Sequence, residues 1–190
     1  MGKSIGKLIL VFVLACLLVS GCGKKKSVGK LHPTGQLLKD FTMEVFGDTF
    51  KLTITGIAAE KKSSESQASV SGPTLEIKSK NFIVEIKTGP KGTGEVFLDP
   101  ETQGITRIII QNNVNISQKN PETGQINFSA NCDKLTYLEK EEIVIMEGSP
   151  KVQQGENIYR ADRIIYSFRE NRLRFEGNVQ VNFRKGISGN

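Results

Sequence analysis

The chain has 190 residues, and its 26 basic and 20 acidic side chains give a formal net charge of +6. Six lysines and no acidic residue precede Leu37, so from Leu37 onward 26 − 6 = 20 basic residues balance 20 acidic ones. The positive charge is therefore confined to the amino-terminal region, which argues against nucleic-acid binding and suits an anionic membrane surface. The single histidine, His32, lies in the same region, so a histidine-based catalytic triad or metal site is not expected in the domain.

The first residues carry the pattern of a bacterial export signal. Lys3 and Lys7 precede an apolar run from Leu8 to Val19, which is followed by Ser-Gly-Cys ending at Cys22. The run is shorter than a bilayer-spanning helix, which needs about 20 residues, and a short apolar run behind a basic start is typical of a signal peptide. Val-Ser-Gly-Cys resembles the bacterial lipobox, which implies cleavage before Cys22 and attachment of diacylglycerol to it. An uncleaved membrane anchor is the alternative.

These observations divide the chain into three predicted parts. They are a lipoprotein signal peptide (1–21), a lipidated basic tether (22–36) and one domain (37–190). A domain of roughly 150 residues is long enough to bury a sizeable core. Cys16 leaves with the signal and Cys22 carries lipid, so Cys132 has no partner for an intramolecular disulfide and is expected to be buried.

Strand-like alternation continues through most of the domain, and no segment after residue 40 has a sustained helical period. In chain order we expect a hairpin over Met43–Gly56 with its turn at Gly47-Asp48, a mobile loop over Glu60–Gly72, two alternating runs within Thr74–Gly89, a turn over Gly89–Gly94, and strands over Ile105–Ser117 and Gln125–Leu138. Asp99–Gly104 and Asn120–Gln125 are sister turns with proline in the second position, as type I turns prefer. Many short strands separated by regular turns predict a sandwich or barrel.

In nearly every predicted strand, one face is aliphatic or phenylalanine and the other is polar. A one-sided antiparallel sheet requires this pattern, and two such dry faces opposed to each other form an interior. The residues expected to line that interior are Ile54, Val84, Ile110, Phe128, Val144, Met146, Leu173, Phe175, Val179 and Val181.

The carboxyl-terminal region contains two copies of one hairpin. Laying Gly148 on Gly177, an offset of 177 − 148 = 29, also matches Asp133 with Asp162, Tyr137 with Tyr166, Met146 with Phe175 and Glu147 with Glu176. A weaker third copy, Ile108–Ile116, has Asn112 in the glycine position. Glycine inside a strand weakens it unless it marks a bulge or bend. We therefore expect Glu-Gly to bend a long strand so that its halves follow two walls.

The two Glu-Gly hairpins, the lipobox and the segment Leu38–Lys62 together resemble the LPS-transport periplasmic family, in particular its membrane-anchored LptC-like subunit. The resemblance implies an all-β fold, a single antiparallel twisted β-jellyroll of the OstA/LptA-like class, V-shaped in cross-section. It implies that the interior residues bind the acyl chains of lipopolysaccharide or a similar lipid. It also implies strand pairing with the membrane subunits of an LPS-export ABC transporter at one end and with a soluble periplasmic carrier of the same fold at the other. Known LptC-like subunits keep a transmembrane helix, whereas this chain has a lipobox. We expect the lipidated chain to lie at the periplasmic face of a membrane, more readily the inner membrane than the outer one.

Both terminal strands lack the proline and charge that usually protect sheet edges. The final strand, expected over Asn178–Phe183, has no proline, and the first, Phe41–Phe46, carries only Glu44. Such edges suit β-augmentation, in which a partner strand adds to the sheet. Partner contacts are expected at Phe41, Met43, Val45, Asn178, Gln180 and Asn182. Alternatively, one edge pairs internally and the other is covered by the tether or tail.

The sequence favours a non-enzymatic lipid-transfer bridge. It contains no P-loop and no glycine-rich dinucleotide turn, no cofactor is expected, and the paired Glu141 and Glu142 fall in a predicted turn. The competing hypothesis is a non-catalytic envelope lipoprotein that acts as a scaffold or interaction module with a closed core. Alternation leaves both open, because a dry core and a lipid groove use the same residue types.

Overall fold

The computed structural model describes residues 37–46, 49–61 and 66–183, and all regular structure in them is β-strand. The strands are β1 (Leu37–Phe46), β2 (Phe50–Lys61), β3 (Gln67–Ser71), β4 (Thr74–Ser79), β5 (Ile83–Lys87), β6 (Thr93–Leu98), β7 (Ile105–Lys119), β8 (Ile126–Leu138), β9 (Ile143–Glu147), β10 (Lys151–Gln154), β11 (Asn157–Arg160), β12 (Arg163–Ser167), β13 (Arg172–Glu176) and β14 (Gln180–Asn182). This part of the chain contains no helix, and hence none that could span a bilayer. The predicted signal, Cys22 and the tether lie outside the described residues.

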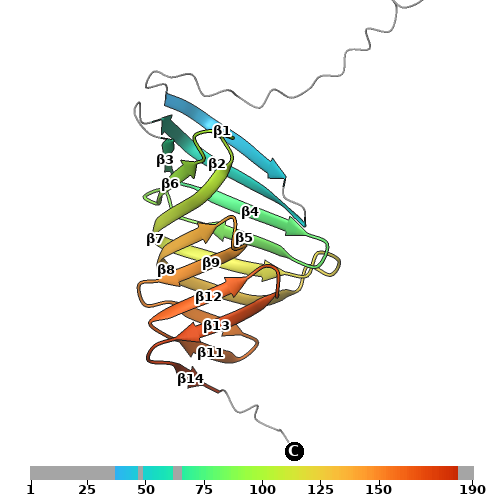
Figure 1. Cartoon of the computed structure of the whole chain (residues 1–190). Coiled ribbons are helices and arrows are strands. Elements are labelled where there is room, and N and C mark those ends of the chain that lie inside the picture. The colour runs from blue at the N-terminus through green and yellow to red at the C-terminus, as the bar shows by residue number, and fades with distance from the viewer. Residues whose placement is uncertain (1–36, 47–48, 62–65, 184–190) are drawn as a thin grey trace, which may run out of the picture. The chain divides into compact units, whose positions relative to one another are not determined.

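The strands form one antiparallel series in which each long strand or broken pair of strands lies beside the next along the chain (Figure 1). β3 and β4 pair with the two halves of β2, β6 and β5 with the two halves of β7, and β9 and β10 with the two halves of β8. β12 and β11 continue from β9 and β10, and β13 and β14 end the series. The series therefore has two walls. We call β4, β5, β10, β11 and β14, with the adjoining halves of β2, β7 and β8, the first wall, and β3, β6, β9, β12 and β13, with the other halves, the second wall.

The walls meet where the chain bends between β9 and β10 and between β13 and β14. Gly148 and Gly177 have φ angles of 73° and 70°, a conformation that side chains with a Cβ rarely adopt. A Cβ on Gly148 would lie 2.7 Å from the Cβ of Asp133, and one on Gly177 would lie 2.8 Å from the Cβ of Asp162. The predicted Glu-Gly bend is thus confirmed in both copies.

The weaker third copy bends as well. Asn112 and Asn113 have φ angles of 72° and 57°, and the register between β7 and β8 shifts between Gln111 and Val114. Asparagine tolerates the left-handed region better than most residues do, so it can stand in for glycine.

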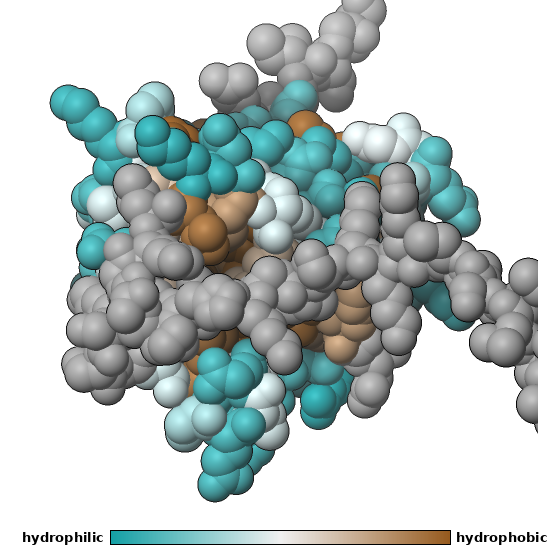
Figure 2. All heavy atoms as spheres, turned by 90° about the horizontal axis from the view of Figure 1, so that it is seen from above, coloured by the Kyte–Doolittle hydropathy of each residue, from teal (hydrophilic) through white to brown (hydrophobic). Residues whose placement is uncertain are grey.

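Apolar residues from both walls fill the space between them. The largest fully buried aliphatic side chains are Leu52, Ile54, Leu75, Ile77, Ile86, Ile108, Ile110, Leu135, Met146 and Ile164. Seen from the β1 end, apolar residues occupy the middle of the molecule and hydrophilic residues surround them (Figure 2). The alternation predicted from the sequence therefore forms the core of an all-β, antiparallel fold.

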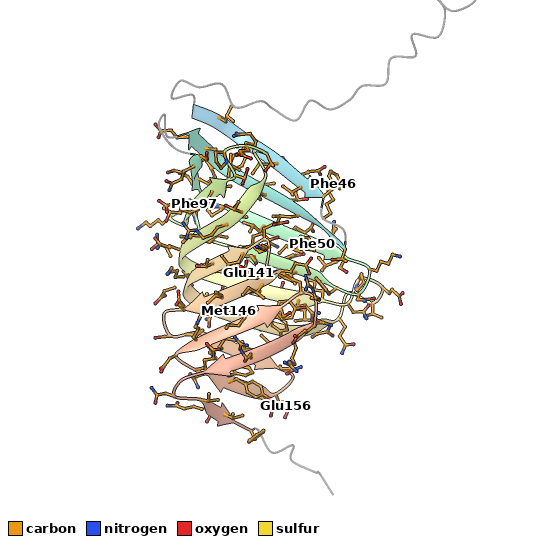
Figure 3. The ribbon with its side chains drawn as sticks, viewed as in Figure 1. Phe46, Phe50, Phe97, Glu141, Met146 and Glu156 are labelled. Atoms are coloured by element: carbon orange, nitrogen blue, oxygen red, sulfur yellow. The ribbon has the colours of Figure 1, made fainter. Side chains whose placement is uncertain are left out.

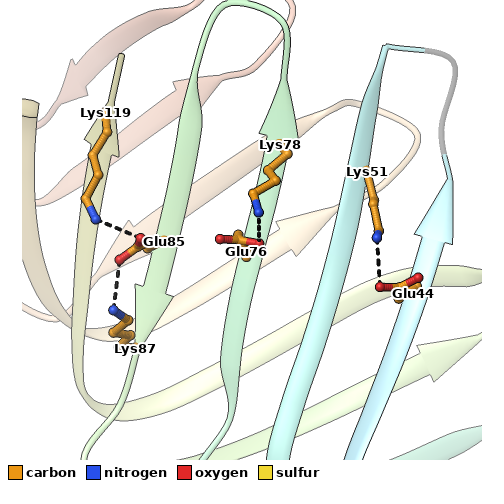
Figure 4. A network of polar contacts seen from close by, with 7 residues as sticks. All are labelled: Glu44, Lys51, Glu76, Lys78, Glu85, Lys87 and Lys119. Carbon is orange, nitrogen blue, oxygen red and sulfur yellow. Dashed lines mark hydrogen bonds and ion pairs between the residues drawn. The ribbon is translucent and has the colours of Figure 1, made fainter. Parts of the chain in front are cut away.

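The outer face of the first wall and of β1 carries ion pairs within strands and between neighbouring strands (Figure 4). The Lys51 ammonium lies 2.7 Å from the Glu44 carboxylate, and Glu85 lies between Lys119 at 2.7 Å and Lys87 at 2.8 Å. The hydrogen bond from Lys119, followed by that from Lys87, lowers the pKa of Glu85 below its ordinary value. These pairs confirm that the polar face of each strand is the outer one.

The sister turns form as predicted. The Asp99 carboxylate accepts the backbone N–H groups of Glu101 and Thr102 at 2.9 and 2.7 Å. The Asn120 side-chain oxygen makes the equivalent pair of contacts in the second turn, at 2.8 and 3.0 Å. In both turns a short polar side chain closes the loop on its own backbone.

The mobile loop predicted over Glu60–Gly72 is wrong in most of its length. β2 continues to Lys61, and Gln67–Ser71 forms β3 between β2 and β6. Ala68 and Val70 alternate with serines and are buried, so a small apolar face was enough to hold the strand in the sheet. The turn predicted over Gly89–Gly94 is shorter than expected, because β6 begins at Thr93.

Candidate functional site

A cleft of about 620 Å³ opens between the two walls near the carboxyl-terminal strands. Its apolar lining includes Phe128 and Tyr159 from the first wall, and Leu173 and Phe175 from the second. The rings of Tyr159 and Phe175 stack across the cleft with their centroids 5.2 Å apart. Phe128 meets Tyr166 edge-on at 5.2 Å. The cleft has the size of a small-molecule site, and its lining combines these apolar side chains with about as much polar surface.

One corner of the cleft is polar. The Tyr166 hydroxyl donates to the Asn171 side-chain oxygen at 2.5 Å, and the Gln118 amide donates to the same oxygen at 3.3 Å. Gln118 is 2% exposed, so this network is a built feature of the interior. Burial raises the pKa of the Tyr166 hydroxyl above its ordinary value, so the group remains a neutral donor. Arg172, whose guanidinium lies 3.1 Å from the Glu170 carboxylate, also lines the cleft. The cleft thus offers apolar contact on one side and hydrogen bonding on the other.

A protein family described as LptA/(LptD N-terminal domain) LPS transport protein matches residues 74–172 of the chain, which include both copies of the hairpin as far as the start of β13. The chain belongs to this family. Its fold is also similar to that of LptH from Pseudomonas aeruginosa, the LptA homologous periplasmic component of the lipopolysaccharide transport device. The similarity has a TM-score of 0.53 at 12% identity and covers 70% of this chain and 95% of LptH. No curated protein matches the chain.

Membership confirms the resemblance to the LPS-transport periplasmic family, and the likeness to LptH confirms an antiparallel jellyroll of that class. The match is to the LptA and LptD branch, so the assignment to an LptC-like subunit stays a prediction. Predicted interior residues fall into two groups in this jellyroll. Ile54, Val84, Ile110, Val144 and Met146 are fully buried in the packed part, whereas Phe128, Leu173 and Phe175 line the cleft. Val181 of β14 is half-buried and lies opposite Tyr159 of β11.

Val179 lies outside the interior, contrary to expectation. It is 50% exposed and precedes β14, which contains only Gln180–Asn182 rather than the predicted Asn178–Phe183. The Asn178 amide donates to the Asp162 carboxylate at 2.9 Å, so this side chain braces the bend and does not extend the edge strand. The left-handed backbone at Gly177 interrupts the alternation on which both predictions depended.

Among the described residues, the strands at both ends of the series are each paired along one edge only. β1 pairs only with β2, β13 only with β12, and β14 only with β11. Phe41, Met43 and Val45 of β1 are partly buried against the core. Phe46, at the end of the same strand, is 73% exposed (Figure 3). The expected edge residues Gln180 and Asn182 are exposed in β14.

Sequence reasoning missed Gln118, Asn171, Tyr159 and Phe168. Tyr159 belongs to β11, a strand of four residues that was not predicted. Asn171 lies in the turn between β12 and β13, where polar residues are ordinary. The only sequence signal was a glutamine at an inward position of an alternating strand, since Gln118 follows Val114 and Ile116 in the same register.

No group of three or more histidine, cysteine, aspartate or glutamate side chains that could hold a metal occurs in the part of the chain that the structure describes. Cys132 is buried, and burial raises the pKa of its thiol to about 12. Glu141 is exposed in the turn between β8 and β9. The candidate functional features of the described residues are therefore the cleft and the two free sheet edges.

Proposed function

We propose that this chain is a lipid-transfer component of lipopolysaccharide export that holds acyl chains between the two walls of the jellyroll. The observation that carries the proposal is the cleft, with its stacked Tyr159 and Phe175 and its adjoining polar corner. An acyl chain gains about 0.8 kcal/mol for each methylene that it buries. Passage to a similar groove in a neighbouring protein is therefore nearly isoenergetic, and an ATPase supplies direction.

The free edges of the strands at the two ends of the series supply the contacts through which lipid passes between proteins. In this proposal the β1 edge pairs with the membrane subunits of an LPS-export ABC transporter, and the β13–β14 edge pairs with a soluble periplasmic carrier of the same fold. Main-chain hydrogen bonds join the sheets, and alternate side chains fix the register. Diacylglycerol on Cys22 holds the chain at the periplasmic face of the membrane, in the position of an LptC-like subunit.

A scaffold with a closed core is the second candidate. It is favoured by the complete burial of Ile54, Leu75, Ile110 and Met146, which leaves no space for a ligand among them. In that case the cleft is a packing irregularity at the end of the sheet, and the protein acts through its surfaces alone.

Photo-crosslinking in cells tests lipid binding. A photoreactive residue at Phe175 should trap lipopolysaccharide, because this side chain lines the cleft. One at Met146 should trap it if acyl chains also enter the packed part of the interior. The matched control is Arg174, whose side chain is exposed and lies 3.0 Å from the Glu176 carboxylate on the outer face. Equal trapping at all three positions, or none at any, would favour the scaffold. Mass spectrometry of lipid extracted from the purified protein gives an independent answer.

Proline substitution tests the carboxyl-terminal edge. Neighbouring residues of an antiparallel strand direct their N–H groups to opposite sides, so Gln180→Pro and Val181→Pro remove donors on different sides of β14. One variant should keep its circular dichroism spectrum and fail to co-purify with the carrier, while the other disturbs the pairing with β11. If both variants stay folded and bind the carrier as tightly as the parent, this edge is not the contact.

A further inference from the structure

The turn between β12 and β13 spans from the second wall to the first. The Phe168 ring in this turn stacks on Phe82 with centroids 6.0 Å apart and packs against Phe50 at 6.1 Å. Phe50 begins β2 and Phe82 precedes β5, so both belong to the ends of first-wall strands. The position of Phe50 at the end of the β1–β2 hairpin is visible in Figure 3. One aromatic side chain of the second wall is thus inserted between two of the first.

A second contact joins the same turn to the first wall. Asn171 accepts the hydrogen bond of 3.3 Å from Gln118, at the end of β7. On its own wall the turn is fixed by a backbone bond of 2.9 Å from the Phe168 N–H to the Glu142 carbonyl, and by an ion pair of 3.3 Å between Arg169 and Glu142. Residues 168–171, which we call the latch, are therefore anchored to the second wall and reach the first through one ring and one amide.

Tyr137 lies beneath the latch with its hydroxyl unpaired. Its ring centroid is 6.1 Å from that of Phe168, the side chain is fully buried, and its oxygen has no hydrogen-bond partner among the described residues. The equivalent hydroxyl of Tyr166 is satisfied by Asn171. A buried unpaired hydroxyl lowers the stability of the closed arrangement and regains a partner when water or a polar ligand reaches it. The closed latch therefore covers a polar group that opening would satisfy.

The packed interior provides no other space for a chain that enters from the side. Behind the latch the walls are filled by fully buried residues such as Ile77 and Ile110, so a branched acylated lipid can enter only if the walls separate. On this side the described contacts between the walls are made by side chains, whereas the opposite side is joined by continuous strands that bend. Besides the latch, Tyr166 meets Phe128 at 5.2 Å and Tyr159 stacks on Phe175 at 5.2 Å. Such contacts can separate together with the latch without breaking the sheet.

We infer that residues 168–171 gate a lateral entrance through which acyl chains reach the interior, and that loading requires the latch to leave Phe50, Phe82 and Gln118. This inference rests on the proposed lipid binding and adds the place where the lipid enters.

The test locks the latch. In the full-length protein, Gln118→Cys and Asn171→Cys place one thiol on each side of the amide contact. A short bis-methanethiosulfonate cross-linker spans the gap that the shorter side chains leave, and it joins them through disulfides that reduction cleaves. Intact mass confirms the link, and the two single variants are controls for modification. The buried Cys132, with its raised pKa, does not react under these conditions. Uptake of BODIPY-labelled lipopolysaccharide is followed by fluorescence before linking, after linking, and after reduction of the disulfides.

The locked form should take up the labelled lipid at least ten times more slowly than the open form, and reduction should restore the rate. Phe168→Leu, which keeps apolar volume and removes the ring contacts, should raise the rate several-fold. Glu101→Gln, at an exposed position in the turn between β6 and β7, should leave it unchanged. Equal rates for locked and reduced protein overturn the latch while leaving lipid binding intact. Failure of the parent itself to take up lipid overturns both. If Phe168→Leu does not fold, the comparison of locked and reduced protein decides alone.

Discussion

Replacing Gly148 by alanine should destabilise the protein far more than replacing Gly124, although both glycines have nearly the same backbone conformation. Their φ angles are 73° and 70°, so each alanine variant loses about 1–2 kcal/mol for a Cβ in the left-handed region. At Gly124 nothing lies within 4 Å of the added Cβ. At Gly148 that atom meets the Asp133 Cβ at 2.7 Å, which adds roughly 1–3 kcal/mol of overpacking.

Urea unfolding followed by circular dichroism measures the difference. We expect about 1–2 kcal/mol of lost unfolding free energy for Gly124→Ala and about 2–5 kcal/mol for Gly148→Ala, with similar m-values. Since the nearest atom is the Cβ of Asp133, Asp133→Gly should recover part of the loss in a double-mutant cycle, and Asp133→Ala should not. Equal losses at Gly124 and Gly148 would show that the close approach of bend and neighbouring strand contributes nothing to stability.

Two further predictions come from the structure and one from the sequence. Tyr166→Phe should lose about 1 kcal/mol of unfolding free energy because Asn171 loses a donor, whereas the equivalent Tyr137→Phe should be neutral or stabilising; equal losses in thermal melts would contradict the assignment of the unpaired hydroxyl. The lowered pKa of Glu85 contributes stability that is present above its ordinary value of 4.5 and is lost as the pH falls through the lowered folded pKa. Lys119→Met should therefore weaken the fall in stability at acid pH, whereas Lys80→Met, at an exposed position, should not. Urea titrations at a series of pH values measure this difference. The mature chain should begin at an acylated Cys22, and an intact mass that retains residues 1–21 would refute the lipobox interpretation.

Much of the fold could be predicted because it depends on local patterns. Alternation identified the inward side of β2, β4, β5, β7, β8 and β9, and the offset of 29 located both glycine bends. The weaker likeness of Ile108–Ile116 to these bends located the asparagine that replaces glycine in β7. The prediction failed where the local pattern was weak or interrupted. β3 has only Ala68 and Val70 among polar neighbours, and its place between β2 and β6 is decided by strands distant in the sequence.

For Val179, the repeat was predicted correctly but the burial of the side chain was not. Its equivalent in the first copy, at 179 − 29 = 150, is Pro150, which is buried because further strands continue beyond β10. After β14 no described strand follows, and Val179 is 50% exposed. The two copies have similar sequences and different positions in the series, and position determines burial.

By itself, the sequence determined the all-β class, the bent repeat and the resemblance to the LPS-transport family, since each depends on residue spacing along the chain. Only the tertiary structure decided that Ile110 and Met146 lie in a closed core while Phe175 faces a cleft, and that Phe168 reaches Phe50 and Phe82. Alternation specifies which face of a strand is dry. It does not specify how far apart two dry faces stand or which turn closes the space between them, because those depend on contacts between residues far apart in the chain.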